Sequence, residues 1–86
     1  MKIFRFNLVF QAEPEGGFTV LVPALPGCVS YGKNLKQAKS MASDAVAGYL
    51  RSLKKHGKPI PNDDNSFISM TEIAVAGDKI KKVSYA

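Results

Sequence analysis

Residues 22–32 read VPALPGCVSYG, and they contain two of the chain's five prolines, two of its seven glycines and its single cysteine. Proline lacks the N–H that a central strand needs, and glycine adopts backbone angles that other residues resist. The stretch therefore predicts a corner. It would carry the chain from a strand at 18–22 into a short third strand at 28–32 and on toward a helix.

Two strand patterns precede this corner. Residues 2–11 alternate with the two-residue period of a strand, and one side of the pattern is apolar, with Phe4, Phe6, Leu8 and Phe10. Residues 12–17, AEPEGG, join a proline to a Gly-Gly pair and predict a hairpin loop. In the strand at 18–22, Phe18, Val20 and Val22 share a face.

One long helix follows the corner. Asn34 is a suitable N-cap, and Gly57, followed by Pro59 and Pro61, marks the end. Apolar residues recur between these signals at spacings of three and four and predict one buried stripe: Leu35, Ala38, Ala42, Ala45, Val46, Tyr49, Leu50 and Leu53. A helix of roughly 22 residues spans about 33 Å, enough to cover a small sheet.

The C-terminal third has weaker patterns. Residues 57–66, GKPIPNDDNS, have the composition of a loop, in which we interpret Asp63 and Asp64 as solvated. Residues 67–75 form one strand or two short pieces. Gly77-Asp78 is a turn signal, and residues 79–85 form a weaker strand with Ile80, Val83 and Tyr85 on it.

The order of elements predicts an α+β fold, β-β-β-α-β with a possible fifth strand, in a single domain over residues 1–86. A strand, a helix and a further strand imply a right-handed crossover that lays the helix on one face of a three- to five-stranded sheet. Ile3, Val9 and Leu21 would then lie on the other face. Burying them against a second copy of the chain predicts a homodimer or higher homo-oligomer.

Composition and charge narrow the function. No apolar run approaches the roughly 20 residues of a membrane helix, and the start of the chain lacks a signal-peptide pattern, so we expect a cytoplasmic protein without membrane contact. One cysteine cannot form an internal disulfide. The net charge is +5, and the excess lies between Lys33 and Lys58, where seven basic residues meet one acid, Asp44.

Residues suited to catalysis are sparse. Cys28 would need a neighbouring base to act as a nucleophile, and the only histidine, His56, lies at the far end of the helix. We interpret Cys28 as a small buried hydrophobe and expect His56 to interact with the terminal carbonyls of the helix. One Cys and one His do not make a zinc site. We therefore expect no enzyme activity, metal, cofactor or small-molecule substrate.

Residues 15–61 resemble the HicB-like antitoxin family of bacteria. The shared positions run from an aromatic strand through the corner to the helix start: Gly17, Phe18, Pro23, Leu25, Pro26, Gly27, Cys28, Ser30 and Gly32. The helix then ends in the family's Gly-x-Pro-x-Pro pattern at residues 57–61, while Ala24 replaces the family's usual Asp. The resemblance implies a partial ribonuclease-H-like fold that binds and neutralises a small HicA-type mRNA-cleaving toxin.

The remaining alternatives concern the partner and any separate DNA-binding domain. Residues 62–86 have strand character and no helix-turn-helix pattern, so we expect no separate DNA-binding domain. The alternative function is an orphan HicB-like oligomer that binds nucleic acid or another protein through its basic helix, with Lys36, Arg51, Lys54, Lys55 and Lys58 as contacts. A small hydrolase built on Cys28 is the third hypothesis.

Overall fold

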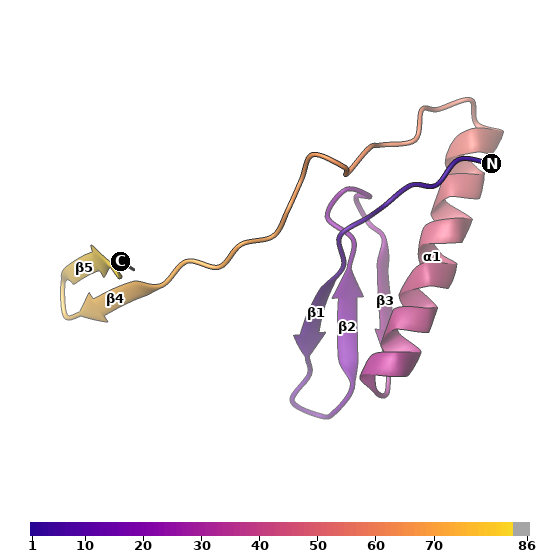
Figure 1. The fold of residues 1–86 in the computed structure, drawn as a ribbon. Helices are drawn as coiled ribbons and strands as arrows, with labels where there is room; N and C mark the ends of the chain where they lie inside the picture. Colours follow the sequence, from indigo (N-terminus) through magenta and orange to yellow (C-terminus); the bar gives the residue numbers. More distant parts are fainter. Residues whose placement is uncertain (84–86) are drawn as a thin grey trace.

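The computed structural model describes residues 1–83 and has six elements in the predicted β-β-β-α-β-β order (Figure 1). Strands β1 (Val9–Ala12), β2 (Phe18–Leu21) and β3 (Val29–Gly32) form an antiparallel sheet in that order. Helix α1 (Leu35–Lys55) packs on this sheet. Strands β4 (Ile73–Ala76) and β5 (Lys79–Lys82) form a separate two-stranded sheet. The predicted α+β class is confirmed.

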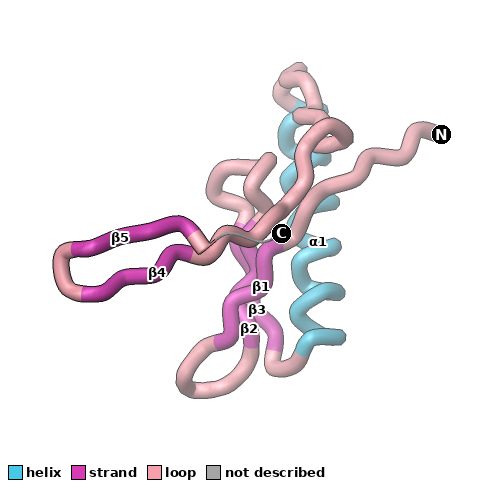
Figure 2. Tube along the Cα trace, turned by 60° about the vertical axis from the view of Figure 1, so that its left-hand side comes forward, coloured by secondary structure: helices cyan, strands magenta, loops and turns pink. Residues whose placement is uncertain are grey.

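The first hairpin forms where AEPEGG predicts it. The Glu13 N–H donates to the Gly17 carbonyl over 3.0 Å, and Gly17 has a φ of 81°, which favours glycine. The first strand is shorter than the prediction of residues 2–11, because β2 offers partners only from Val9↔Leu21 to Ala12↔Phe18. Residues 1–8 instead run as an unpaired segment toward the helix (Figures 1 and 2).

Helix α1 has the predicted caps. The Asn34 side chain accepts a hydrogen bond from the Gln37 N–H over 2.8 Å. At the other end Gly57, with a φ of 66°, lets the Lys58 N–H donate to the Leu53 carbonyl over 2.9 Å. His56 Nδ1 lies 2.7 Å from the Ser52 carbonyl oxygen, which confirms its expected place at the terminal carbonyls.

The core lies between α1 and the strands β2 and β3. Val20 and Leu25 are fully buried, and Ala38 and Ala42 form the part of the helix stripe that is closest to the sheet. Around the corner a second cluster joins Leu25 to other residues, Val22, Cys28, Phe6, Leu8, Ala45, Val46, Tyr49 and Leu50. Leu35, predicted in the buried stripe, is exposed at the first turn of the helix.

The C-terminal segment differs most from expectation. Residues 67–72 are not a strand, β4 is only Ile73–Ala76, and it pairs with β5 and not with the main sheet, so the predicted crossover is not formed. We call residues 66–83 the arm; all of them are exposed, and they extend away from the body (Figures 1 and 2). Tyr85, predicted on the last strand, lies outside the described residues.

The arm determines the shape of the molecule. The radius of gyration is 16.9 Å, whereas a compact chain of this length has about 12 Å. The sequence pattern identified residues able to form strands, but it did not identify their partners. That distinction explains why the last two strands were predicted and their position was not.

Candidate interaction surfaces

The corner at residues 22–32 is closed by its own backbone. The Leu25 N–H donates to the Val22 carbonyl and the Cys28 N–H to the Leu25 carbonyl, each over 2.9 Å. Leu25 and Cys28 point into the core, while Pro23, Pro26 and Gly27 are exposed. The Tyr49 hydroxyl of α1 donates to the Pro26 carbonyl over 3.0 Å. The motif therefore connects the corner to the helix.

The other motif residues lie where the sheet meets the helix. Phe18 and Gly32 are paired across β2 and β3. A Cβ on Gly17 would lie 2.7 Å from the Gly32 carbonyl oxygen, so glycine at position 17 permits close approach to β3. A Cβ on Gly32 would lie 2.7 Å from the Gln37 carbonyl carbon, so glycine at position 32 permits close approach of β3 to α1. The Ser30 Oγ is buried and has no hydrogen-bond partner among the described residues. These residues shape the scaffold.

Cys28 is a buried hydrophobe, as predicted, with 6 % of its surface exposed. Desolvation by burial raises the pKa of its thiol above the ordinary value. The thiolate, which is the nucleophile, is therefore disfavoured, and this site does not support the hydrolase hypothesis. Among residues 1–83, no group of three or more His, Cys, Asp and Glu is placed to hold a metal ion.

The prediction that Asp63 is solvated is wrong. Asp63 is 9 % exposed, and its carboxylate accepts a hydrogen bond from the Asn7 N–H over 2.8 Å. Asn7 also donates through Nδ2 to the Ser66 carbonyl over 3.4 Å. Ala24 lines the same hollow, in which Asp63 is the one carboxylate among the lining residues. No signal in the sequence distinguished Asp63 from the exposed Asp64, since their local composition is the same.

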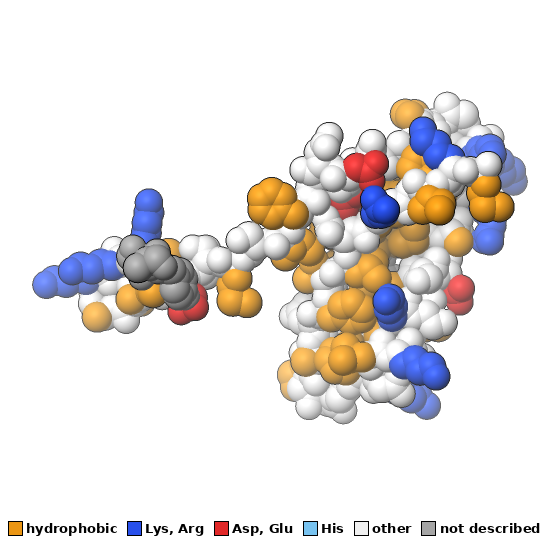
Figure 3. All heavy atoms as spheres, in the orientation of Figure 1, with side chains coloured by type: hydrophobic (Ala, Val, Ile, Leu, Met, Phe, Trp, Pro, Cys, Tyr) orange, Lys and Arg blue, Asp and Glu red, His pale blue; other side chains and the backbone are white. Residues whose placement is uncertain are grey.

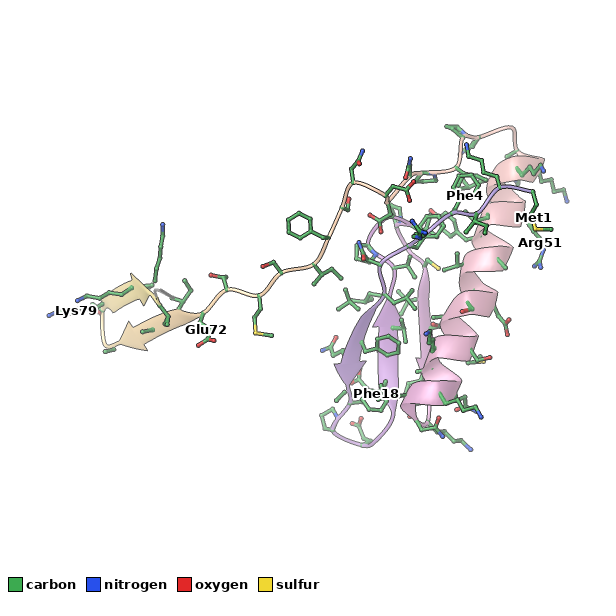
Figure 4. The ribbon with its side chains drawn as sticks, viewed as in Figure 1. Met1, Phe4, Phe18, Arg51, Glu72 and Lys79 are labelled. Atoms are coloured by element: carbon green, nitrogen blue, oxygen red, sulfur yellow. The ribbon has the colours of Figure 1, made fainter. Side chains whose placement is uncertain are left out.

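The basic residues of the helix are all exposed, but they do not form one patch. Lys36 lies fifteen residues before Arg51, which is about 22 Å along a helix. Arg51, Lys54 and Lys55 lie in the last turns, and Lys58 follows the helix end. Figure 3 shows blue side chains at both ends of α1, and Figure 4 labels Arg51 on the C-terminal half of the helix.

The far face of the main sheet carries an apolar row that the helix does not cover. Val9, Leu21 and Val29 lie opposite one another across the three strands. Val29 is 54 % exposed, and Leu21 and Tyr31 are also exposed. We call Leu21, Val29 and Tyr31 the far face. Leu21 was predicted there; Val29 and Tyr31 were missed, although their alternation with buried Cys28 and half-buried Ser30 was a usable signal.

Comparison with known proteins now adds the family. Residues 6–78 match the sequence model of the HicB-like antitoxin of bacterial toxin–antitoxin systems. The chain belongs to the HicB-like antitoxin family. No helix within residues 1–83 is both long enough and apolar enough to cross a lipid bilayer.

Individual relatives cover most of this HicB-like chain. A UPF0150 protein of Thermoplasma acidophilum is 36 % identical over 66 residues, which are 77 % of this chain and 96 % of the relative. One from Helicobacter pylori is 37 % identical over 70 residues, 81 % of this chain and 96 % of the relative. One from Synechocystis is 29 % identical over 63 residues, 73 % of this chain and 80 % of the relative. All of these matches extend well beyond the corner motif.

Proposed function

We propose that this HicB-like protein is a non-enzymatic antitoxin-type module that binds and neutralises a small HicA-type mRNA-cleaving toxin. The observation that carries the proposal is the family match over residues 6–78, which includes the sheet, the corner and the helix. The motif residues build a scaffold, and this suits a protein that acts by binding. The proposal places the protein in the cytoplasm, because the toxin's substrate is mRNA.

The far face is the surface we assign to the toxin. Leu21, Val29 and Tyr31 form a contiguous apolar patch on regular strands, so its shape is fixed before binding. Exposed apolar patches of this kind mark protein–protein contacts, and tyrosine is enriched in their centres.

The test is co-expression of the chain with the product of the adjacent small reading frame. We expect the two proteins to co-purify and the toxin's RNA cleavage to stop. Val29→Asp should weaken the complex at least tenfold, a loss of about 1.4 kcal/mol. Met41→Asp is the matched control, because Met41 is 46 % exposed on the helix, near the 54 % of Val29. Equal weakening by both variants, or no complex, contradicts the proposal.

Self-association is the second part of the proposal. The far face and the arm both expose large apolar side chains, and a monomer would leave both in water. A homodimer or higher homo-oligomer would bury part of that surface. Self-association is tested by measuring the mass of the protein in solution, which should be a multiple of the chain mass of 9.3 kDa.

A second candidate function is nucleic-acid binding by the helix. It is favoured by the exposed positions of Lys36, Arg51, Lys54, Lys55 and Lys58, the last four of which lie within eight residues of one another. Binding through phosphates would weaken steeply with salt, and the slope of log affinity against log salt would shrink by about 0.9 for each lost contact. A slope unchanged in Arg51→Ala excludes a phosphate contact by Arg51.

A further inference from the structure

The arm carries a dense set of exposed apolar side chains. Phe67 is 85 % exposed and Met70 86 %, and the other large apolar side chains of the arm are Ile68, Ile73, Val75, Ile80 and Val83. None of the contacts between elements links β4 or β5 to the sheet or helix of the body in the described chain. A segment of this composition, held away from its own core, has the character of a strand without its partner.

The hairpin at the end of the arm has two different faces. Val75 is paired with Ile80 and Ile73 with Lys82, so these four residues share one face, which is apolar except for Lys82. Ala74, Ala76, Lys79 and Lys81 lie on the other. A two-stranded hairpin alone is marginally stable in water and needs a packing surface. The apolar face is the side of the hairpin that must be covered.

The body offers an open edge. In the described chain β1 pairs with β2 on one side, and its other edge has no neighbouring strand (Figure 1). Unpaired N–H and C=O groups along such an edge bind a further strand. Helix α1 contacts β2 and β3 but not β1, so the side chains of this edge, including Phe10, are incompletely covered.

We propose that the arm of one copy packs along the free β1 edge of a second copy, and the second arm packs on the first copy in return. The proposal rests on the self-association proposed above and assigns it to a surface. If each large apolar side chain exposes on the order of 100 Å² of surface, the seven in the arm together expose roughly 700 Å². With half of that buried, two arms and the surfaces they cover total roughly 1,400 Å², within the range of stable interfaces.

The root of the arm favours a second copy over the chain's own edge. Asp63 and Ser66 are hydrogen-bonded to Asn7, just before β1, and from there the arm leads away from the body (Figures 1 and 4). Pro59 and Pro61 restrict the backbone that precedes this anchor. A basic partner would be a poorer occupant than a second copy, since β5 places three lysines, Lys79, Lys81 and Lys82, on the arm.

Mass measurements on two matched variants test the arm exchange. Val75→Asp puts a charge on the apolar face of the hairpin, and Ala74→Asp puts the same charge one residue away on the other face. We expect the wild type and Ala74→Asp to have twice the chain mass of 9.3 kDa by light scattering, and Val75→Asp to have the mass of one chain. Since the hairpin of β4 and β5 makes no contact with the strands or helix of the body, the helical circular dichroism of all three should agree.

The outcomes separate the two proposals. A monomeric wild type overturns both self-association and the arm exchange. A Val75→Asp dimer overturns the arm exchange and leaves self-association standing. Inhibition of toxin cleavage is a separate readout, so its failure concerns the antitoxin proposal alone.

Crosslinking distinguishes exchange between copies from folding back within one. Two differently tagged chains, both Cys28→Ala, carry Met70→Cys and Gln11→Cys respectively, and are co-expressed and treated with a short bismaleimide. We expect a covalent product of the two chains, and none when Met41→Cys on α1 replaces Gln11→Cys. A chain with both cysteines that crosslinks only within itself, or no crosslink at all, overturns the proposal.

Discussion

Replacing Gly32 with alanine should separate β3 from α1. A Cβ added to Gly32 would lie 2.7 Å from the Gln37 carbonyl carbon and closer still to the backbone N and Cα of Ala38. Backbone atoms of a capped helix cannot rotate away, so the whole helix start must shift. Overpacking costs about 1–3 kcal/mol, and this contact with backbone places Gly32→Ala near 3 kcal/mol. The melting temperature should fall by about 12–24 °C.

Gly48→Ala is the matched control, since it adds the same methyl group elsewhere in the protein. Gly48 lies within α1, is exposed, and a Cβ there would meet nothing within 4 Å. Alanine is favoured over glycine in a helix by about 0.8–1 kcal/mol, so this variant should be more stable than the wild type. Thermal unfolding followed by far-ultraviolet circular dichroism measures the melting temperatures of the two variants and the wild type. A Gly32→Ala protein within about 1 kcal/mol of wild type would refute the close approach of β3 and α1.

Three further predictions concern single polar groups. Asp63→Ala should cost about 1.5–3 kcal/mol and speed hydrogen exchange at the Asn7 amide, whereas Asp64→Ala, at an exposed position, should do neither. Ser30→Ala removes a buried hydroxyl without a partner, so the free energy of unfolding should rise by about 1 kcal/mol, seen as a higher urea midpoint at an unchanged m value. A loss of stability would show that the hydroxyl has an unrecognised hydrogen bond. Burial raises the pKa of Cys28, so stability should be full below the unfolded pKa of about 8.5 and fall as pH rises toward the folded value. In Cys28→Ala the free energy of unfolding should fall less as the pH rises above this range, because the thiol is gone. The same dependence of stability on pH in the variant and the wild type would contradict this prediction.

The body could be predicted from the sequence because its signals are local. Asn34 and Gly57 fixed the helix ends, and the alternation of residues 18–22 fixed the strand face. The corner motif located the turn and the burial of Cys28. Each of these depends on backbone preference or short-range spacing, and so needs no knowledge of distant contacts.

The arm and the anchor of Asp63 could not be predicted for the opposite reason. Asp63 and Asn7 are 56 residues apart, so no spacing rule connects them. Residues 67–72 have the apolar alternation of a strand, but strand formation requires a neighbouring edge, and the chain's own edge is not used. The far-face position of Val29 and Tyr31 was within reach of the sequence, since β3 alternates in the expected way.

The most direct measurement adds the purified chain, in increasing amounts, to the HicA-type toxin from the adjacent reading frame and follows mRNA cleavage. We expect cleavage to stop once the chain matches the toxin in amount, and a Val29→Asp chain to require a clear excess. Undiminished cleavage at a large excess of the wild-type chain would contradict the antitoxin function.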